Sequence, residues 1–403
     1  MSHTPKILYI ATHCPFGESY GARMRTLQIG RLLQRVGPVT MVLASVGRWS
    51  DEDIAQTRAE FDLRVVSRAE PVPIRGPVER LRHEFDPGYL NTHGFAVPRA
   101  DAEKVFALAD SHDVVWLHTL RVANLFRRWK WERSVLDIDD FLSQYHATMA
   151  SQAANPVQRL ISSRRAWLWR RREKDLFDRF DAVSVCSEED RSRLAHPERV
   201  HVIPNGFDDP PQVRQAGSPS CLGVIGRLDY LPNRDGVEWF LQKVWPGVRA
   251  RMPDAEFRIV GTGAPESWGR IAGVSVLGYV EDSAAEIAGW AAMTVPLHIG
   301  AGTRIKIAEA FARACPVIST TLGAFGYEVE NGRELLLADT PEAFADACIR
   351  VLRSKEERAR LSAAGRSYFL SRLHWDALAR RVEDAVEGVR RRNQSVERER
   401  EYA

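Results

Sequence analysis

The sequence has few cysteines and no long hydrophobic run, and each absence excludes a class of protein. Its five cysteines lie far apart and never in a C-x-x-C spacing, so they indicate neither a disulfide framework nor a zinc site. Most have apolar neighbours, and we expect buried thiols at Cys14, Cys186, Cys221, Cys315 and Cys348. No apolar run approaches the roughly 18 residues that a membrane-spanning helix requires.

A large net charge is also absent. The formal net charge of the 403 residues is only +3, so overall charge gives no argument for nucleic-acid binding, and any basic function must be local. The strand-like segment Ile7–Ala11 follows Met1 closely, with no leader between them. We therefore expect a protein that works in a reducing cytoplasm without a nucleic-acid partner.

The sequence has instead an alternation of short β-rich runs and longer helical patterns. Hydrophobic residues make up 44% of the chain and charged residues 27%, as in globular proteins, and 403 residues exceed a single hydrophobic core. Nearly continuous apolar runs are typical of parallel strands that are buried on both faces. The alternation predicts an α/β fold with two doubly wound domains.

The expected strands of the first half are 7–11, 39–43, 63–66, 114–117, 134–138, 182–186 and 200–203. The expected strands of the second half are 222–225, 256–260, 274–277, 293–296, 317–320 and 335–337. The expected helices are 21–35, 157–179, 234–251, 284–289, 304–314, 341–352 and 356–371.

A break in the pattern predicts the domain boundary. Residues 209–219 concentrate proline, glycine and polar side chains, as a linker does, between a first domain at 1–208 and a second at 220–375. We expect residues 376–390 to form a helix that packs back toward the first domain. Residues 391–403 are charged and nearly free of large apolar groups, so we expect a flexible tail.

The most informative segment is Gly300–Phe311, which combines a glycine turn, a helix start, two cations and a carboxylate. Glycines let the backbone approach an anion, and the free N–H groups of a first helical turn point at it. Arg304 and Lys306 can add charge-assisted hydrogen bonds to phosphate oxygens. Glu309 lies roughly 7.5 Å further along such a helix, about the reach from a diphosphate to its ribose. The alternative is a surface helix with a solvated charged face.

Several further motifs carry a family resemblance. Residues 222–236, 257–263, 276–282, 296–306 and 331–337 follow in the order and spacing of the retaining, family-4 type "group 1" glycosyltransferases of GT-B fold, and residues 181–191 and 202–208 match that family more loosely. The resemblance implies two Rossmann-like domains that face each other across a cleft. The second domain would bind a nucleotide-diphosphate sugar, and the first would bind the acceptor.

The resemblance also implies roles for residues of the second domain. Glu309 matches the carboxylate that holds the ribose hydroxyls, and Arg227 matches the arginine that faces the phosphates. The loop whose amides receive the diphosphate corresponds to Gly302, Thr303 and Arg304. The turn that cradles the base corresponds to Gly278, Tyr279 and Val280.

In the first domain the resemblance implies three donor contacts. His118 matches the histidine that meets the transferred sugar, although a histidine after a buried strand is also often a satisfied core residue. Gly17 and Gly21 fall in the loop that brings backbone close to the donor phosphate.

The chain departs from the family pattern at two places. The first glutamate of the usual pair is replaced by Ala301, and the lysine that usually follows Arg227 is replaced by Asn233 or Arg234. Our hypothesis is that Lys306, with Arg304, supplies the charge that the other loop lacks.

The family mechanism implies retention of configuration without a metal or cofactor. In a front-face displacement the leaving phosphate accepts the proton of the acceptor, so no general base is needed. Asp139 or Asp140 could orient the acceptor hydroxyl. The cluster at 137–140 leaves two alternatives, which are a metal site and a solvated turn.

The stretch Val157–Arg179 is rich in arginine and also contains tryptophan, and residues 126–131 repeat the mixture. A basic amphipathic helix of this kind can lie on an anionic membrane. Alternatively, its arginine stems cover the domain core. Relatives often act on lipid-linked acceptors, which favours the membrane.

We therefore expect a glycosyltransferase that moves a sugar to a saccharide or lipid-linked saccharide in cell-surface polysaccharide biosynthesis, at the inner face of the cell membrane. Two alternatives stay open: a nucleotide-sugar epimerase of GT-B fold, and a non-catalytic relative that binds nucleotide sugar.

Overall fold

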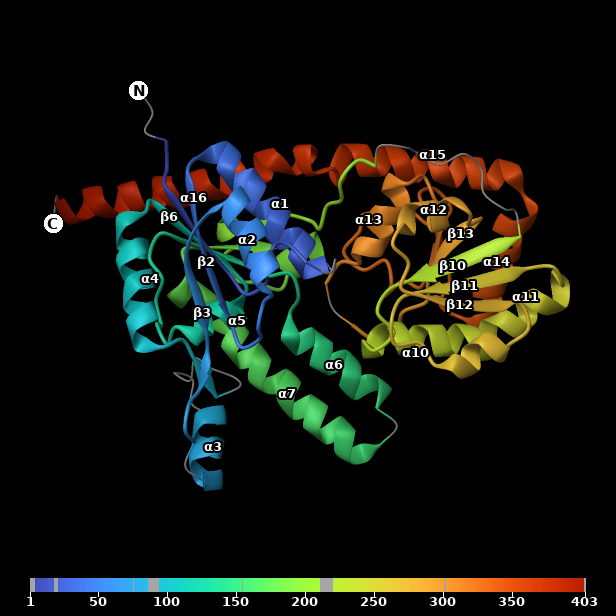
Figure 1. Cartoon of the computed structure of the whole chain (residues 1–403), viewed down its shortest axis with the longest axis horizontal. Coiled ribbons are helices and arrows are strands. Elements are labelled where there is room, and N and C mark those ends of the chain that lie inside the picture. Colours follow the sequence, from blue (N-terminus) through green and yellow to red (C-terminus); the bar gives the residue numbers. More distant parts are fainter. Residues whose placement is uncertain are drawn as a thin grey trace. The chain divides into compact units, whose positions relative to one another are not determined.

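The computed structural model describes residues 4–17, 21–74, 76–85, 94–153, 155–210, 220–300 and 302–401 (Figure 1). The chain forms two compact units. Unit 1 comprises Met1–Ser143, Arg164–Pro204 and Leu378–Ala403, and unit 2 comprises Gln144–Ser163 and Asn205–Ala377. The chain therefore enters unit 2 twice and returns to unit 1 at its end. The predicted linker lies, from residue 211 on, outside the described residues.

Unit 1 contains a seven-stranded parallel sheet in the order β3-β2-β1-β6-β7-β8-β9. The strands are β1 (Ile7–Ala11), β2 (Val39–Ser45), β3 (Asp62–Arg68), β6 (Val114–His118), β7 (Ser134–Asp137), β8 (Ala182–Val185) and β9 (Val200–Val202). Two short strands, β4 (Glu70–Pro71) and β5 (Phe95–Ala96), pair separately. The helices include α1 (Gly21–Val36), α2 (Asp51–Glu60), α3 (Gly76–Phe85), α4 (Arg99–Ser111), α5 (Leu120–Leu125), α8 (Leu176–Arg179) and α9 (Glu188–Arg191).

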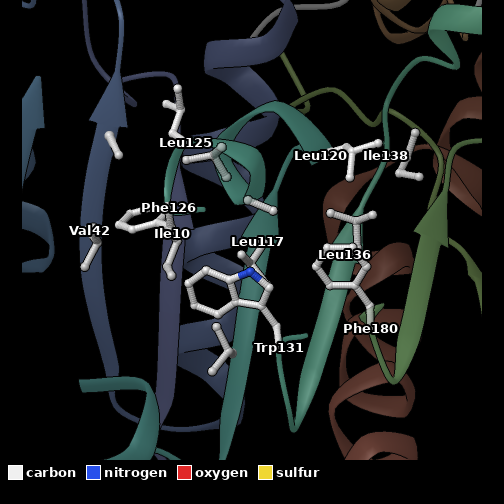
Figure 2. Packing of buried hydrophobic residues seen from close by; sticks show 14 of the residues in the cluster. Ile10, Val42, Leu117, Leu120, Leu125, Phe126, Trp131, Leu136, Ile138 and Phe180 are labelled. Carbon is white, nitrogen blue, oxygen red and sulfur yellow. The ribbon is translucent and has the colours of Figure 1, made fainter. Parts of the chain in front are cut away.

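One hydrophobic cluster of unit 1 lies on one face of this sheet. Ile10, Leu117 and Leu136 extend from neighbouring strands toward Phe126 and Trp131 (Figure 2). The rings of Phe126 and Trp131 meet edge to face with centroids 5.6 Å apart. These two aromatic residues are therefore part of the buried core, whereas Arg127, Trp129 and Lys130 between them are exposed.

Unit 2 contains a six-stranded parallel sheet in the order β12-β11-β10-β13-β14-β15. The strands are β10 (Cys221–Ile225), β11 (Glu256–Val260), β12 (Val274–Gly278), β13 (Ala292–Val295), β14 (Val317–Ser319) and β15 (Leu336–Leu337). The helices include α6 (Leu142–Gln152), α10 (Leu231–Trp239), α11 (Trp245–Arg251), α12 (Ser283–Ala288), α13 (Ile305–Ala312), α14 (Pro341–Arg353) and α15 (Lys355–Arg372). A π-helical turn, Phe240–Val244, joins α10 to α11.

Both sheets confirm the predicted α/β class, and all five cysteines are buried free thiols as expected. The predicted helix at 157–179 is instead α7 (Pro156–Lys174) followed by the short α8. The last helix, α16 (Trp375–Glu401), continues through residues 391–401, where the sequence predicted a flexible tail. Among the described residues, no helix combines the length and apolar character needed to cross a membrane.

Candidate functional site

The first part of the candidate site is the edge of the unit 2 sheet where the strands end. Gly226 follows β10 and Gly261 follows β11, both with positive φ, at 149° and 132°. A Cβ at Gly261 would collide with the carbonyl oxygen of Gly226, so the two loops pack backbone against backbone. This close approach requires glycine and leaves the loop ends beside α13.

A cluster of hydrogen-bonded polar side chains joins the loop after β10 to α13. Lys306, in the first turn of α13, donates from Nζ to Oδ1 of Asn233 at 2.8 Å. The amide nitrogen of Asn233 donates to the carbonyl oxygen of Arg227 at 2.9 Å. Asn233 is one of the two residues, with Arg234, that the family resemblance aligns with the missing lysine, and it binds the ammonium of Lys306. The structure therefore places a cation from α13 at the loop where the family's lysine is missing.

Lys306 has an unusual proton affinity. Burial of the ammonium, and then the neighbouring charge of Arg304, lower the pKa of Lys306 to about 7. An anion bound next to this ammonium would favour its charged form.

The predicted diphosphate loop lies directly before α13. The hydroxyl of Thr303 accepts a hydrogen bond from Asn205 at 2.9 Å, and Arg304 Nη1 donates to the carbonyl of Gly302 at 3.0 Å. Arg227 is exposed and forms an ion pair with Asp229 at 2.5 Å. Ala301, where the family carries its first glutamate, lies outside the described residues.

The predicted ribose and base contacts also lie together. Glu309 on α13 accepts from Ser283 Oγ at 3.4 Å and pairs with Arg313 Nε at 3.1 Å. Ser283 begins α12, directly after the turn at Gly278–Val280. In that turn Gly278 has φ 68° and Tyr279 is 74% exposed. The structure therefore brings the carboxylate to the start of α12, the helix that follows the turn assigned by the resemblance to the base.

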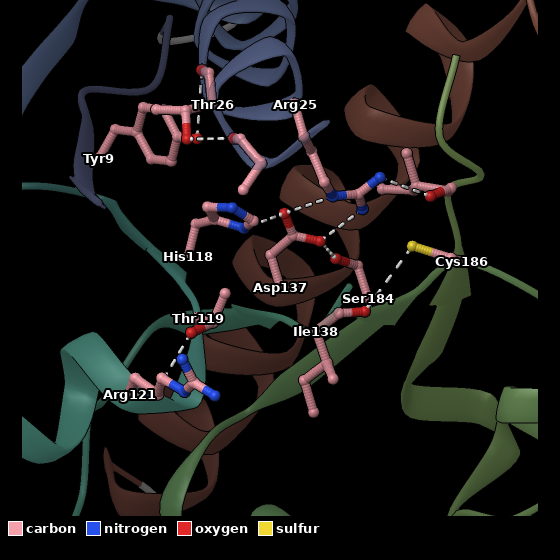
Figure 3. Close-up of polar contacts among 12 residues, drawn as sticks. Tyr9, Arg25, Thr26, His118, Thr119, Arg121, Asp137, Ile138, Ser184 and Cys186 are labelled. Carbon is pink, nitrogen blue, oxygen red and sulfur yellow. Dashed lines mark hydrogen bonds and ion pairs between the residues drawn. The ribbon is translucent and has the colours of Figure 1, made fainter. Parts of the chain in front are cut away.

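The second part of the candidate site lies in unit 1, at the ends of three neighbouring strands. His118, Asp137 and Ser184 end or nearly end β6, β7 and β8 and are paired in register, so they stand side by side (Figure 3). His118 Nδ1 lies 3.0 Å from Asp137 Oδ2, and Ser184 Oγ donates to Asp137 Oδ1 at 2.5 Å. All three side chains are fully buried.

An arginine from α1 completes this cluster. Arg25 donates to both oxygens of Asp137, from Nε at 3.0 Å and from Nη2 at 2.6 Å. Burial alone would raise the pKa of Asp137, but the charge of Arg25 and the hydrogen bond from His118 hold it well below its usual range. Sequence reasoning missed Arg25 and Ser184 as functional candidates, and it considered Asp137 only as a member of the cluster at 137–140. The one available signal was the position of Asp137 directly after an apolar run.

The remaining unit 1 candidates are more exposed. Asp139 is half-buried and Asp140 is exposed. Asp137, the first member of the same cluster, has both oxygens bound to hydrogen-bond donors. Across the described ranges, no group of three or more His, Cys, Asp and Glu side chains is placed to hold a metal ion.

The two glycines of the first loop lie near α1. Gly17 has φ 108°, and a Cβ there would collide with the guanidinium of Arg23. Gly21 is the first residue of α1, while residues 18–20 lie outside the described part. This loop therefore leads to a helix N-terminus, the feature that the phosphate hypothesis requires.

Helix α7 divides its aromatic residues between core and surface. Trp169 is buried, and the guanidinium of Arg172 lies over its ring at 5.2 Å. Trp167 is exposed, and so are the apolar Val157, Leu160 and Ile161. Exposed arginines stand along the same helix: Arg159, Arg164, Arg165, Arg170 and Arg171. Arg179, in contrast, is buried and binds Asn124 at 2.8 Å, so the basic surface ends before it.

Comparison with known proteins identifies the chemistry of unit 2. Residues 219–354 match the model of the family described as "Glycosyl transferases group 1". This span contains the glycine loops, α13 and Glu309. The chain therefore carries a group 1 glycosyltransferase domain and is a glycosyl transferase of class EC 2.4 by that domain. No curated protein matches the sequence at a significant level.

Solved structures with similar folds cover nearly the whole chain. Sucrose-phosphate synthase from Thermosynechococcus elongatus aligns with TM-score 0.65 and 17% identity over 93% of this chain and 96% of that one. HepE from Anabaena, in complex with UDP and glucose, aligns with TM-score 0.64 and 15% identity over 95% and 99%. WaaG, a glycosyltransferase involved in lipopolysaccharide biosynthesis, aligns with TM-score 0.59 and 12% identity over 94% and 99%. These likenesses show the GT-B fold.

Proposed function

We propose that the protein is a retaining glycosyltransferase that moves a sugar from a nucleotide-diphosphate sugar to a hydroxyl of a saccharide or lipid-linked saccharide. The observation that carries this proposal is the cluster at the start of α13. There the loop Gly302–Arg304 and the ammonium of Lys306 would face the diphosphate. Glu309, one turn further along α13, would face the ribose. Glycine loops and a helix N-terminus favour bound phosphate. HepE, with the same fold, binds UDP and glucose.

The proposed chemistry uses charge rather than a cofactor or metal. As the glycosidic bond breaks, negative charge grows on the leaving diphosphate, and cations near it stabilise the transition state more than the ground state. In this proposal the cations near the leaving diphosphate are Arg227, Arg304 and Lys306. The incoming hydroxyl attacks the sugar from the face that the diphosphate leaves, and the departing diphosphate oxygen accepts its proton. Because the new bond forms on the same face as the broken one, the sugar keeps its configuration.

The decisive experiment measures nucleotide release from a panel of nucleotide sugars, with and without saccharide acceptors. Acceptor-dependent release of nucleoside diphosphate, with a product of retained configuration by NMR, is the expected result. Conversion of the donor without acceptor would indicate an epimerase instead. Binding without conversion under either condition would indicate a non-catalytic relative. Thermal-shift screening finds the donor first, because a ligand of the folded state raises the melting temperature.

We further propose an acceptor at the inner face of the cell membrane, in polysaccharide biosynthesis. Exposed Trp167, Leu160 and neighbouring arginines on α7 combine apolar and basic groups as a membrane-surface helix does. WaaG, of the same fold, acts in lipopolysaccharide biosynthesis.

This membrane contact is tested with vesicles that contain anionic lipid. Each basic residue near such a surface contributes about 1 kcal/mol, so the pair of changes Arg170→Gln and Arg171→Gln should weaken vesicle binding about thirtyfold. The matched control neutralises two exposed arginines of α16, Arg391→Gln and Arg392→Gln, and should leave binding unchanged. If the unmodified protein does not float with anionic vesicles, the membrane contact is wrong.

A further inference from the structure

We propose that Asp137 and Arg25 hold His118 in one tautomer, with the proton on Nδ1, so that Nε2 accepts a hydrogen bond from a hydroxyl of the bound sugar. This inference rests on the proposed function and adds the direction of a hydrogen bond. Asp137 and Arg25 act here as positioning residues, and His118 is the residue that touches the sugar.

The sheet itself fixes which nitrogen carries the proton. Parallel pairing sets His118 directly opposite Asp137, and His118 Nδ1 lies 3.0 Å from Asp137 Oδ2. An ionised carboxylate only accepts hydrogen bonds, so Nδ1 must donate. In the neutral ring Nε2 then carries a lone pair and no proton.

Arg25 keeps the carboxylate of Asp137 ionised and fixes its orientation. Its guanidinium binds both oxygens of Asp137, and its remaining Nη1 donates to the carbonyl of Ile203 at 3.0 Å. A bidentate pair fixes geometry as well as charge. Ser184 adds a further donor to Oδ1, on the side of the carboxylate away from His118. Asp137 therefore accepts four hydrogen bonds and has one arrangement available, as Figure 3 shows.

The other ring nitrogen of His118 has no partner. His118 Nε2 is buried and forms no hydrogen bond to any described residue. An unsatisfied buried polar atom costs about 1–3 kcal/mol, which a bound ligand can recover. The neighbouring ring of His13 lies 6.3 Å away between centroids, and burial, then the nearby His118, lower its pKa to about 4. His13 is therefore neutral at physiological pH and adds no positive charge beside His118.

The chemistry of Nε2 selects the ligand group. A lone pair needs a donor, and a sugar hydroxyl provides one, whereas phosphate oxygens are acceptors. A buried acceptor built for one hydroxyl rejects an analogue that lacks it, because the acceptor is then left unpaired. The inference thus predicts that one sugar hydroxyl is recognised through His118.

The first test is nitrogen-15 NMR of the histidine rings in the full chain, with His118 assigned through a His118→Gln variant. The expected spectrum has a protonated Nδ1 and an unprotonated Nε2. A proton on Nε2 in the unmodified protein would overturn the proposal whatever the donor proves to be, and the variant serves only to assign the signals.

The second test changes the carboxylate. Asp137→Asn should move the proton of His118 from Nδ1 to Nε2, because the amide can donate to Nδ1. Asp190→Asn is the matched control: it removes another buried carboxylate of unit 1, which binds Ser187 at 2.8 Å, and should leave His118 unchanged. If Asp137→Asn folds by circular dichroism and His118 keeps its tautomer, the positioning role is wrong.

The third test identifies the ligand group, with UDP-glucose and its monodeoxy derivatives as probes. UDP-glucose should shift the Nε2 resonance, and one deoxy derivative should bind about tenfold more weakly to the unmodified protein. The penalty for that derivative should vanish in His118→Phe, because the phenyl ring has no nitrogen to pair with the hydroxyl. UDP-glucose that binds by calorimetry without shifting Nε2 would overturn the hydroxyl contact. Absence of UDP-glucose binding would instead count against the proposed donor class, while the tautomer tests would still decide the positioning role.

Discussion

At the residue scale, Lys306 is the side chain through which the proposed donor binding should depend on pH. Its pKa is lowered to about 7 by burial and by Arg304, so in the free protein about half of the molecules carry the cation near neutral pH. A bound diphosphate raises this pKa, because an opposite charge favours the ammonium. Under the proposed function, binding of UDP above pH 7 should therefore take up a proton.

The resulting prediction concerns pH. The affinity for UDP should be constant below the free-state pKa and should fall as pH rises through about 7, by up to about tenfold per pH unit. Calorimetric titration at several pH values checks this, and two buffers of different ionisation enthalpy reveal the proton uptake. Lys306→Met should bind UDP more weakly and lose this part of the pH dependence. An affinity that rises with pH would contradict the assignment.

The site of the missing family lysine gives a second residue-scale prediction. Lys306→Met should lower turnover about a hundredfold, as removal of one transition-state donor does. Adding Asn233→Lys should recover about tenfold or more, since position 233 touches the Lys306 ammonium at 2.8 Å. The matched control, Asn233→Gln combined with Lys306→Met, should recover nothing. Equal activity of the two double variants would show that charge at this place does not matter.

Sequence alone could predict some of these residues and not others. Lys306 and Glu309 belong to one helix, and their positions follow from the rise of a helix. Arg25 and Asp137 are separated by 112 positions along the chain and meet only through the sheet. An arginine in a helix usually lies on a solvated face, so nothing local indicates that Arg25 is buried. Partners that tertiary structure creates are therefore invisible to a local pattern.

At the element scale, the position of α13 depends on its contact with α15. A Cβ at Gly365 of α15 would lie 2.6 Å from Cδ1 of Phe311 on α13, which real atoms do not tolerate. Glycine is unfavourable within helices, so its presence here serves the close approach of the two helices. Because α13 carries Lys306 and Glu309, this contact also sets where the candidate donor groups lie.

The corresponding prediction compares two glycines. Gly365→Ala should lower the free energy of unfolding by about 1–3 kcal/mol through overpacking against Phe311, and it should weaken UDP binding. Gly247→Ala in α11 is the matched control, since its Cβ would meet Ala345 at an ordinary 3.7 Å. That change should be neutral or stabilise by up to about 1 kcal/mol. Urea denaturation measures both, and equal effects would refute the packing argument.

The elements were predictable where their apolar pattern was strong. The continuous apolar run 7–11 gave β1 with the observed bounds, and the bounds of β11 at 256–260 were also predicted. Helix α2 was missed because Thr57 is its one buried residue, so the segment shows no apolar stripe. The end of α7 was misplaced because arginines continue past Lys174, whereas the helix stops before α8. Charge composition does not mark a helix end, and caps made by backbone groups leave no trace in sequence.

At the scale of the whole molecule, the path of the chain divides it differently from a simple two-part partition. The sequence pattern separates a first half from a second half and predicts a helix at 376–390 that packs back toward the first domain; in the structure the final residues from Leu378 onward belong to unit 1. Helix α16 places Arg381 against the carbonyl of Val202 at 2.9 Å, at the β9 edge of the unit 1 sheet. The last helix of the chain therefore belongs mostly to the same unit as the first strand.

The last prediction separates the stability of the two units. Leu378 and Val382 are fully buried on α16, so Leu378→Ala should cost unit 1 about 2–5 kcal/mol through lost burial and a cavity. Differential scanning calorimetry should then show a lower transition for unit 1, while added UDP still raises the transition of unit 2. The matched control, Glu383→Ala on the exposed face of the same helix, should move neither transition by much. If Leu378→Ala lowered the UDP-dependent transition as well, α16 would stabilise both units and the assignment of this helix to unit 1 alone would be wrong.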